Sequence, residues 1–281
     1  MASTTKPAAS THHQTMRGTT LILMAVAALA GFPLQAKASI QLGTAGDFAV
    51  LAGTTVTNTG PTVIDGGDVG VHPGSAITGF LPGIVNPPFT IRDTVVDAVA
   101  LVQAKSDLVT AYNQAAGLAV TQVLTGTDLG GLTLTPGVYF FSSSAGLTGT
   151  LTLNAQGDPN AEFVFQIGST LITAPSSSVV TINNGVGLPG CNVFWQVGSS
   201  ATLDTGTAFK GHILALTSIA LKTGATILDG SALARDGEVT LDDNRITNCV
   251  TPIPEPSTMT IFLIGGALLA LRRSWDGTRS R

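Results

Sequence analysis

One eight-residue segment occurs twice in this chain, with its two copies thirty residues apart. Residues 163–170 read FVFQIGST and residues 193–200 read VFWQVGSS. Apolar positions match apolar positions, Gln166 matches Gln196, and each copy ends in glycine followed by two hydroxyl residues. Neither copy contains a carboxylate, histidine, lysine or cysteine, so the repeat carries almost no acid–base chemistry. Because strands that recur at a fixed period are typical of stacked coils, the repeat predicts a solenoid.

Short strands fill the chain from Gly137 to Thr247. Segments rich in Val, Ile, Thr, Phe and Leu alternate there with Gly, Asn, Asp, Ser or Pro. Examples are VYFF, GTLTLN, STLIT, SSVVTINN, HILALT, ATILDG and EVTLDDN. They follow one another too closely for helical crossovers. A β-helix explains the repeat, and a β-sandwich stays open, although it would want clearer two-residue turns.

Residues 90–117 break the strand pattern and predict one long α-helix. Thr90 would cap the start of the helix and Gly117 would end it. Its length of about 39 Å suits a helix packed along the side of a solenoid. Apolar residues at three–four spacing predict the stripe that packs. The stripe comprises Ile91, Val95, Ala98, Val102, Val109 and Tyr112.

Charge and metal-binding residues are sparse. Only 11% of the residues are charged, against about 25% in typical globular domains. Residues 40–253 contain six Lys or Arg and fifteen Asp or Glu, which gives a net charge of −9. This balance argues against nucleic acid as a partner, because its binders need a basic face. His72 and His212 are isolated in the sequence, so no metal site is predicted.

The N-terminus has the pattern of a secretory signal peptide over residues 1–38, with an extended n-region. Arg17 precedes an apolar run from Leu21 to about Leu34, and cleavage by signal peptidase is expected after Ala38. A permanent membrane anchor is the alternative, but the run is shorter than the ~20 residues that a spanning helix needs.

Cys191 and Cys249 both lie in the part that would be exported. An even number of cysteines in an oxidising compartment favours a disulfide. It would close a loop of about 59 residues and stabilise the fold by roughly 4 kcal/mol. Two unpaired thiols remain the alternative.

Residues 251–281 have a second targeting pattern. The order of features resembles the PEP-CTERM sorting signal: a Pro-Glu-Pro motif, an apolar segment (258–271) and a basic tail. The motif comprises Pro254, Glu255 and Pro256. The resemblance implies membrane contact through this end, then release by an exosortase-type enzyme to the surface or matrix of a Gram-negative bacterium. An ordinary anchor is the alternative, but the segment covers only about 21 Å of a ~30 Å hydrocarbon core.

A wider resemblance covers residues 42–248. Its motifs include LGTAGDFAVLAGTTVTNTG, LTLTPGVYFF, NAEFVFQIGSTLITA, GCNVFWQVGSSATL and GSALARDGEVTLDDNRIT, in this order. This order resembles the ice-binding-like domain of microbial antifreeze proteins. The resemblance implies that residues 39–250 form a right-handed, irregular β-helix with one long helix alongside. It also implies that the N-terminal segment docks against late coils, and that the domain has no cofactor and no catalytic activity.

Members of that family adsorb to ice or ordered water through one flat β-face with outward Thr, Ser and small residues. Strand alternation predicts such a face here. Inward residues would be Val56, Leu171, Ala201, Leu203, Ile219 and Leu221. Outward residues would be Thr55, Thr57, Thr170, Ile172, Ser200, Thr202, Ser218 and Ala220. Asp204 and Lys222 would also point outward, and their hydration water would roughen the face. The alternative is that these threonines are only good strand formers on a solvated surface.

Two rival functions follow from the same residues. The sorting signal favours a matrix or adhesive protein that binds exopolysaccharide or a cell surface. An enzyme would need carboxylate pairs, and acidic residues do gather late in the sequence. These are Asp229, Asp236, Glu238, Asp242 and Asp243. They stand in turn contexts where Asp is ordinary, so we predict no catalytic residue.

Overall fold

The two copies of the repeated segment lie side by side as strands β12 (Phe163–Ile167) and β15 (Val193–Val197). They pair in parallel and in register, so that Gln166 stands opposite Gln196. The chain bends after each strand at Gly168 and Gly198. A Cβ atom at Gly198 would lie 2.6 Å from the carbonyl oxygen of Gly168, so glycine lets neighbouring coils approach at this bend.

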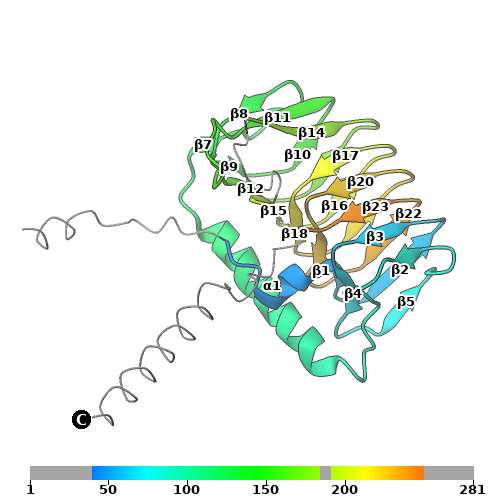
Figure 1. Ribbon diagram of the computed structural model, residues 1–281. Coiled ribbons are helices and arrows are strands. Elements are labelled where there is room, and N and C mark those ends of the chain that lie inside the picture. Colours follow the sequence, from blue (N-terminus) through cyan, green and yellow to red (C-terminus); the bar gives the residue numbers. More distant parts are fainter. Residues whose placement is uncertain (1–39, 184–190, 250–281) are drawn as a thin grey trace, which may run out of the picture. The chain divides into compact units, whose positions relative to one another are not determined.

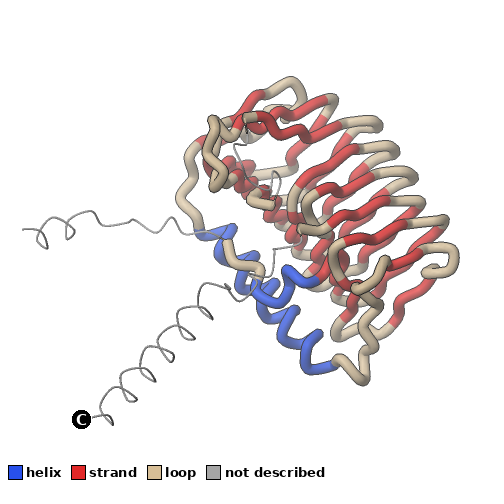
Figure 2. Tube along the Cα trace, in the orientation of Figure 1, coloured by secondary structure: helices blue, strands red, loops and turns tan. Residues whose placement is uncertain are grey.

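The computed structural model describes residues 40–183 and 191–249, which wind into a β-solenoid with three parallel sheets (Figures 1 and 2). Sheet A has eight strands in the order β4-β1-β21-β18-β15-β12-β9-β7. Its other strands are β4 (Asp68–Val71), β1 (Phe48–Ala52), β21 (Ala232–Ala234), β18 (His212–Ala215), β9 (Gly137–Phe141) and β7 (Gln122–Val123).

Sheets B and C form the other two sides of the coil. Sheet B has the order β10 (Ala145–Leu147), β13 (Leu171–Thr173), β16 (Ala201–Leu203), β19 (Ile219–Leu221), β22 (Val239–Asp242), β2 (Thr55–Thr59) and β5 (Ala76–Thr78). Sheet C has the order β6 (Ile84–Val85), β3 (Val63–Asp65), β23 (Arg245–Thr247), β20 (Thr226–Leu228), β17 (Ala208–Lys210), β14 (Ser178–Ile182), β11 (Thr150–Asn154) and β8 (Thr133–Leu134). Every described strand pair is parallel, which excludes the antiparallel sandwich. Right-handed winding stays a prediction.

As the resemblance implied, the coils do not stack in the order of the sequence. Strand β1 pairs with the late strand β21, and β2 and β3 pair with β22 and β23. Two buried asparagines hold this junction. The side-chain amide of Asn248 donates to the carbonyl oxygens of Gly46 and Phe48, and the backbone N–H of Asn244 donates to the hydroxyl of Thr62. The first coil is therefore fastened to the last one by specific polar contacts.

An aromatic ladder runs through the interior of the solenoid. The rings of Phe165 and Trp195 stack with centroids 3.9 Å apart, and Tyr139 lies 5.4 Å from Phe165 on the other side. Phe209 extends the ladder at 4.8 Å from Trp195. The indole N–H of Trp195 donates to the carbonyl oxygen of Lys210, which satisfies its only polar atom. Phe165 and Trp195 of the repeat are thus rungs of this ladder, whereas Val164 and Phe194 face the helix.

The long helix is shorter than predicted. Helix α1 (Ala98–Gly117) ends where the sequence indicated, but its expected start at Thr90 is wrong. Ile91 instead forms a β-bridge with Val69. The carboxylate of Asp93 then accepts the backbone N–H groups of Val95 and Val96, and this local turn precedes the helix.

The predicted packing stripe of the helix is wrong for three of its six residues, whereas Tyr112 is buried and Ala98 and Val109 are half-buried. Ile91, Val95 and Val102 are 39%, 83% and 50% exposed. The buried face comprises Leu101, Ala104, Leu108, Ala111, Tyr112 and Ala115. These residues pack on the outer side of sheet A. Because the sheet contributes large side chains such as Phe48 and Phe194 there, the helix contributes short ones such as alanine.

Two polar contacts fix the helix against the solenoid. The side-chain amide of Gln166 donates to the carbonyl oxygens of Ala115 and Leu118, at 2.8 and 2.9 Å. It thereby satisfies carbonyl groups that the end of a helix leaves without partners. Lys105 donates to the carbonyl oxygens of Ala234 and Arg235. Burial lowers the pKa of Lys105 to about 8. The glutamine of the repeated segment therefore serves to hold the helix end.

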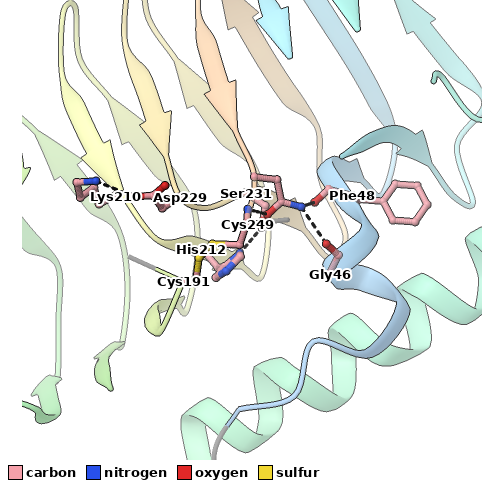
Figure 3. The surroundings of a disulfide bond; sticks show 9 residues. Gly46, Phe48, Cys191, Lys210, His212, Asp229, Ser231 and Cys249 are labelled. Carbon is pink, nitrogen blue, oxygen red and sulfur yellow. Dashed lines mark hydrogen bonds and ion pairs between the residues drawn. A yellow bond between two sulfur atoms is a disulfide. The ribbon is translucent and has the colours of Figure 1, made fainter. Parts of the chain in front are cut away.

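The predicted disulfide is present between Cys191 and Cys249, whose Cα atoms lie 5.7 Å apart. It joins the start of β15 to the end of the last coil (Figure 3). His212 lies beside it, fully buried, with its Nδ1 atom 2.8 Å from the hydroxyl of Ser231. Burial lowers the pKa of His212 to about 4, so the folded protein holds it neutral.

Several predictions fall on other parts of the chain. The signal peptide (1–38) and the C-terminal signal (251–281), with its Pro254-Glu255-Pro256 motif, lie outside the described residues. Within residues 40–183 and 191–249, no helix combines the length and apolar character needed to cross a membrane.

His212 makes the stability of the fold depend on pH. Because its pKa is about 4 when folded and about 6.5 when unfolded, the unfolded chain binds a proton first as pH falls. We expect the free energy of unfolding to decrease by about 3 kcal/mol through this residue between pH 6.5 and pH 4. Chemical denaturation at several pH values measures it. The variant His212→Gln should lose this component, and an unchanged pH dependence in that variant would contradict the assignment.

Candidate flat-face site

The three sheets of the solenoid present different outer surfaces. Sheet A is covered by α1, and its five-residue strands β12 and β15 are buried along their whole length (Figure 1). Sheet C carries ion pairs, with Lys210 2.8 Å from Asp229 and Arg245 3.3 Å from Asp65. Sheet B is left open, and we take its outer surface as the candidate site.

A single row of outward residues crosses the middle of sheet B, which we call the central row. The pairing register places one residue from each strand in line. In sheet order they are Gly146, Ile172, Thr202, Ala220, Thr240, Thr57 and Thr78. All seven are uncharged and short or medium in length. Neighbours in the row are about 4.8 Å apart, because that is the spacing of paired strands.

A second row lies two residues earlier along the strands, and we call it the leading row. It comprises Ser144, Thr170, Ser200, Ser218, Glu238, Thr55 and Ala76. The hydroxyls of Ser144 and Thr170 are 2.7 Å apart, and the hydroxyl of Thr55 is 3.5 Å from the carboxylate of Glu238. The two rows together form a grid with about 6.6 Å between rows.

The structure brings all eight predicted face residues into these two rows. Thr57, Ile172, Thr202 and Ala220 lie in the central row, and the leading row holds the other four, Thr55, Thr170, Ser200 and Ser218. The six predicted inward residues are buried, each at most 2% exposed. Inward and outward alternation on sheet B is therefore confirmed.

Sequence reasoning missed several members of the rows. Thr240 and Glu238 belong to the segment EVTLDDN, which was recognised as a strand but not assigned to this sheet. Alternation alone would have turned Thr240 outward. Thr78 and Gly146 sit on the two edge strands β5 and β10, whose place follows only from the order of the coils.

The expected charged residues do face outward, but they lie at one side of the sheet. Lys222 and Asp204 form an ion pair at 3.3 Å, two positions beyond Ala220 and Thr202. The backbone N–H of Thr205 lowers the pKa of Asp204, which keeps this carboxylate charged. The charges thus border the grid at the turn toward sheet C and do not interrupt its central row.

A shallow depression lies between the central row and the charged border of sheet B. Ala220, Thr57 and Thr240 line it from the central row, and Lys222 and Asp242 line it from the border. Each hydroxyl group in its lining can donate one hydrogen bond and accept two. The depression can therefore hold ordered water against the face.

A loop covers the free edge of sheet B at β10. Leu129 donates its backbone N–H to the carbonyl oxygen of Gly146. The carboxylate of Asp128 accepts the N–H groups of Gly130 and Thr148 at 2.7 and 3.0 Å, and the hydroxyl of Thr148 at 3.0 Å. These contacts protect the edge strand and hold the first member of the central row in place.

The late carboxylates lie at different places in the coil. Asp229 follows β20, Asp236 and Glu238 lie in the turn before β22, and Asp242 ends β22, with Asp243 in the turn after it. Three different corners of the coil therefore hold them. Among the described residues, no group of three or more His, Cys, Asp or Glu side chains could hold a metal ion.

Known proteins match this chain over most of its length. The family model described as ice-binding-like matches residues 50–247. An ice-binding protein of Nostoc sp. (strain HG1) is 53% identical over 259 residues, covering 89% of this chain and 92% of that protein. An ice-binding protein of Flavobacterium frigoris (strain PS1) is 34% identical and covers 74% and 76%.

Solved structures agree with these relatives. The crystal structure of an ice-binding protein from an Antarctic biological consortium matches with a TM-score of 0.68 and 46% identity, covering 78% of this chain and 96% of that one. The ice-binding protein of the Antarctic ascomycete Antarctomyces psychrotrophicus matches with a TM-score of 0.69 and 41% identity, covering 76% and 100%.

Asp128 provides a test of how the edge of the face is held. We expect Asp128→Ala to cost about 1–2 kcal/mol, because three donors lose their shared acceptor. Hydrogen exchange at the Leu129 amide should become roughly tenfold faster. Asp158→Ala removes a similar turn carboxylate, which accepts the N–H of Asn160, at a distance from sheet B. Equal exchange at Leu129 in both variants would refute the capping role.

Proposed function

The chain belongs to the ice-binding-like family, and we propose from this premise that it binds ice through the outer surface of sheet B. Binding would slow the growth or recrystallisation of ice without any chemical reaction. Its partner is then a surface of ice or ordered water, and the protein needs neither a cofactor nor a catalytic residue.

The central row is the observation that carries this proposal. Seven coils present uncharged side chains in one register, and four of these residues are threonines: Thr202, Thr240, Thr57 and Thr78. Charged groups hold their own hydration water strongly, whereas a threonine offers one hydroxyl and one methyl group. A regular grid of such groups can order water into a layer that merges with ice.

Rigidity supports the same function. Every inner strand of sheet B is paired on both sides, and the residues beneath the grid are buried except Ile77 on the edge strand β5, which is half-buried. Side chains that branch at Cβ, such as threonine, also have few rotamers to lose on binding. The face therefore loses little conformational entropy when it binds an ice crystal, so many weak contacts together can give measurable affinity.

The border charges set a limit on the size of the face. The ion pair between Asp204 and Lys222 and the carboxylate of Glu238 lie outside the central row. Their hydration shells would keep ice away from the neighbouring positions. We therefore assign the main contact to the central row and the hydroxyl members of the leading row.

We further propose that the protein acts outside the cell. Residues 1–38 would direct export, and the PEP-CTERM-like signal in residues 251–281 would give transient membrane contact before release to the surface of a Gram-negative bacterium. The disulfide between Cys191 and Cys249 supports an oxidising compartment. The alternative of a matrix or adhesive protein gains no support from the two rows, because they contain no aromatic side chain on which a sugar ring could stack.

Replacement of Thr202 tests the face. Thr202→Tyr places a bulky ring in the middle of the central row, and we expect recrystallisation inhibition to require a roughly tenfold higher protein concentration. The matched control is Thr226→Tyr, at a half-buried outward position on sheet C. Ice recrystallisation and thermal hysteresis assays on both variants measure the effect.

Two outcomes of this comparison would be informative. Full activity in the Thr202→Tyr variant would reject sheet B as the ice-binding surface. Loss of activity in the Thr226→Tyr variant alone would move the site to sheet C. Circular dichroism and denaturation should show that both variants remain folded.

Processing at the two ends is tested by the mass of the exported protein. In a host that carries both signal peptidase and an exosortase-type enzyme, we expect a form that begins at Ser39 and ends near the Pro254-Glu255-Pro256 motif. Replacing the motif by three alanines should leave the C-terminal segment attached and the protein associated with membranes. Release of that variant at the normal rate would contradict the sorting role.

A further inference from the structure

A ridge of valines at the start of α1 and in the turn before it has no partner among the described residues of the fold. It comprises Val95, Val96, Val99 and Val102, which are 83%, 84%, 86% and 50% exposed. Val95 and Val96 lie in the turn just before α1, and Val99 and Val102 lie in its first turns. Four large apolar side chains together form a contiguous patch of the kind that marks an interaction surface.

A groove runs beside this valine ridge. It lies between α1 and the short helix η1 (Gly43–Asp47), and Phe48, Val96, Val99 and Ala100 supply its apolar lining. Its polar members include Asp47, Arg92 and Asp97. The groove and the ridge form one apolar surface, because Val96 and Val99 belong to both.

The rim of the groove is acidic. Among the described residues that line the groove, Arg92 is the one cation, and it is already paired with Asp68 at 2.5 Å and with Asp97 at 3.6 Å. Asp47 remains as an exposed carboxylate of the lining, and Asp93, also exposed, follows Arg92 in the chain. This charge disfavours an anionic membrane, and in a symmetric contact it would set the acids of two copies against each other. An apolar partner that ends in basic residues fits the groove best.

The chain's own C-terminus has that chemistry. Residues 258–271 are apolar apart from a few small polar side chains. Arg272, Arg273, Arg279 and Arg281 follow, against a single acid, Asp276. The tail after the apolar segment is therefore positively charged where the groove is negatively charged.

The described chain also ends next to the groove. Asn248 donates to the carbonyl oxygen of Gly46, and Cys249 shares a surface depression with Gly46 and Asp47 (Figure 3). Asp47 lines the groove as well. The eight residues 250–257 can span at most about 28 Å when extended, and they start from a depression that shares Asp47 with the groove.

We propose that the groove and the valine ridge hold the C-terminal apolar segment, residues 258–271, of the same chain. The segment covers the valines, and the arginines that follow it meet the acidic rim. The short connection gives the segment a high effective concentration at the groove, so it docks within its own chain. Docking shields the apolar segment from water and from other chains until a membrane or a processing enzyme takes it.

Photo-crosslinking in the full chain tests this contact. Val99 is replaced by p-benzoylphenylalanine, and the matched control carries the same probe at Val123, which is 63% exposed on the far edge of sheet A. We expect the probe at position 99 to form an intramolecular crosslink to a peptide within residues 254–281. The probe at position 123 should not form it. Peptide mapping by mass spectrometry identifies the partner.

A charge substitution gives a second readout. Val99→Asp should release the segment, and trypsin should then cleave the full chain at Arg272 and Arg273 about tenfold faster. Val123→Asp should leave this rate unchanged. Both aspartates replace exposed valines, so the variants should fold normally.

Other occupants of the groove would appear as different results. A crosslink between two chains, with a dimer in sedimentation analysis, would identify a second copy and overturn the proposal. A crosslink to residues 1–38 would identify the N-terminal segment and overturn it too. Absence of any crosslink together with equal cleavage rates would show that the groove is empty.

Discussion

Backbone hydrogen bonding between successive coils is the constraint on which this structure depends. Each strand pairs in parallel with the strand one coil away, so the backbone groups of the inner strands are satisfied by neighbouring coils. The register of one pair then sets the register of the next. Because side chains alternate across a strand, every residue of a coil is assigned either to the interior or to one of three outer surfaces. The repeated segment is what this constraint looks like in sequence: Phe165 stacks on Trp195 inside, while Gln166 faces outward and holds the end of α1.

The same constraint creates a difficulty at the ends of the stack, where strands lose a neighbour. The chain meets it by inserting its first coil between the last coil and the strands β4, β5 and β6. This junction has no covalent continuity, and Asn244 and Asn248 bind it together from the last coil. The disulfide between Cys191 and Cys249 fixes the end of that coil to an earlier one. Continuity of the central row from Thr240 to Thr57 depends on this junction, since the two residues are 183 positions apart in sequence and adjacent in the sheet.

Sequence reasoning succeeded where the pattern depends on one strand at a time. Alternation identified Val56 and Leu171 as buried and Thr57 and Ile172 as outward, and no knowledge of the coil order was needed. It failed where two surfaces compete. The helix has valines along one side and leucines with alanines along the other, so apolar spacing alone could not tell which side meets the sheet. The side with alanines packs on the sheet because the outer surface of sheet A carries large rings, and only short side chains allow the helix to approach them. The coil order itself followed from family resemblance, since no local pattern states that β1 pairs with β21.

The three outer surfaces of the solenoid have different roles. The helix packs on sheet A, and strands β12 and β15 of this sheet therefore carry apolar residues on both faces. Sheet C carries the ion pairs of Lys210 and Arg245, which keep that side solvated. Sheet B has neither a cover nor a charge in its central row, although a short row of Lys or Glu would make it more soluble. A central row kept uncharged over seven strands is costly in solubility, and the contact with ice that we propose for it would explain that cost. Acidic residues elsewhere, which leave residues 40–253 with a net charge of −9, offset it and keep the chains apart in solution.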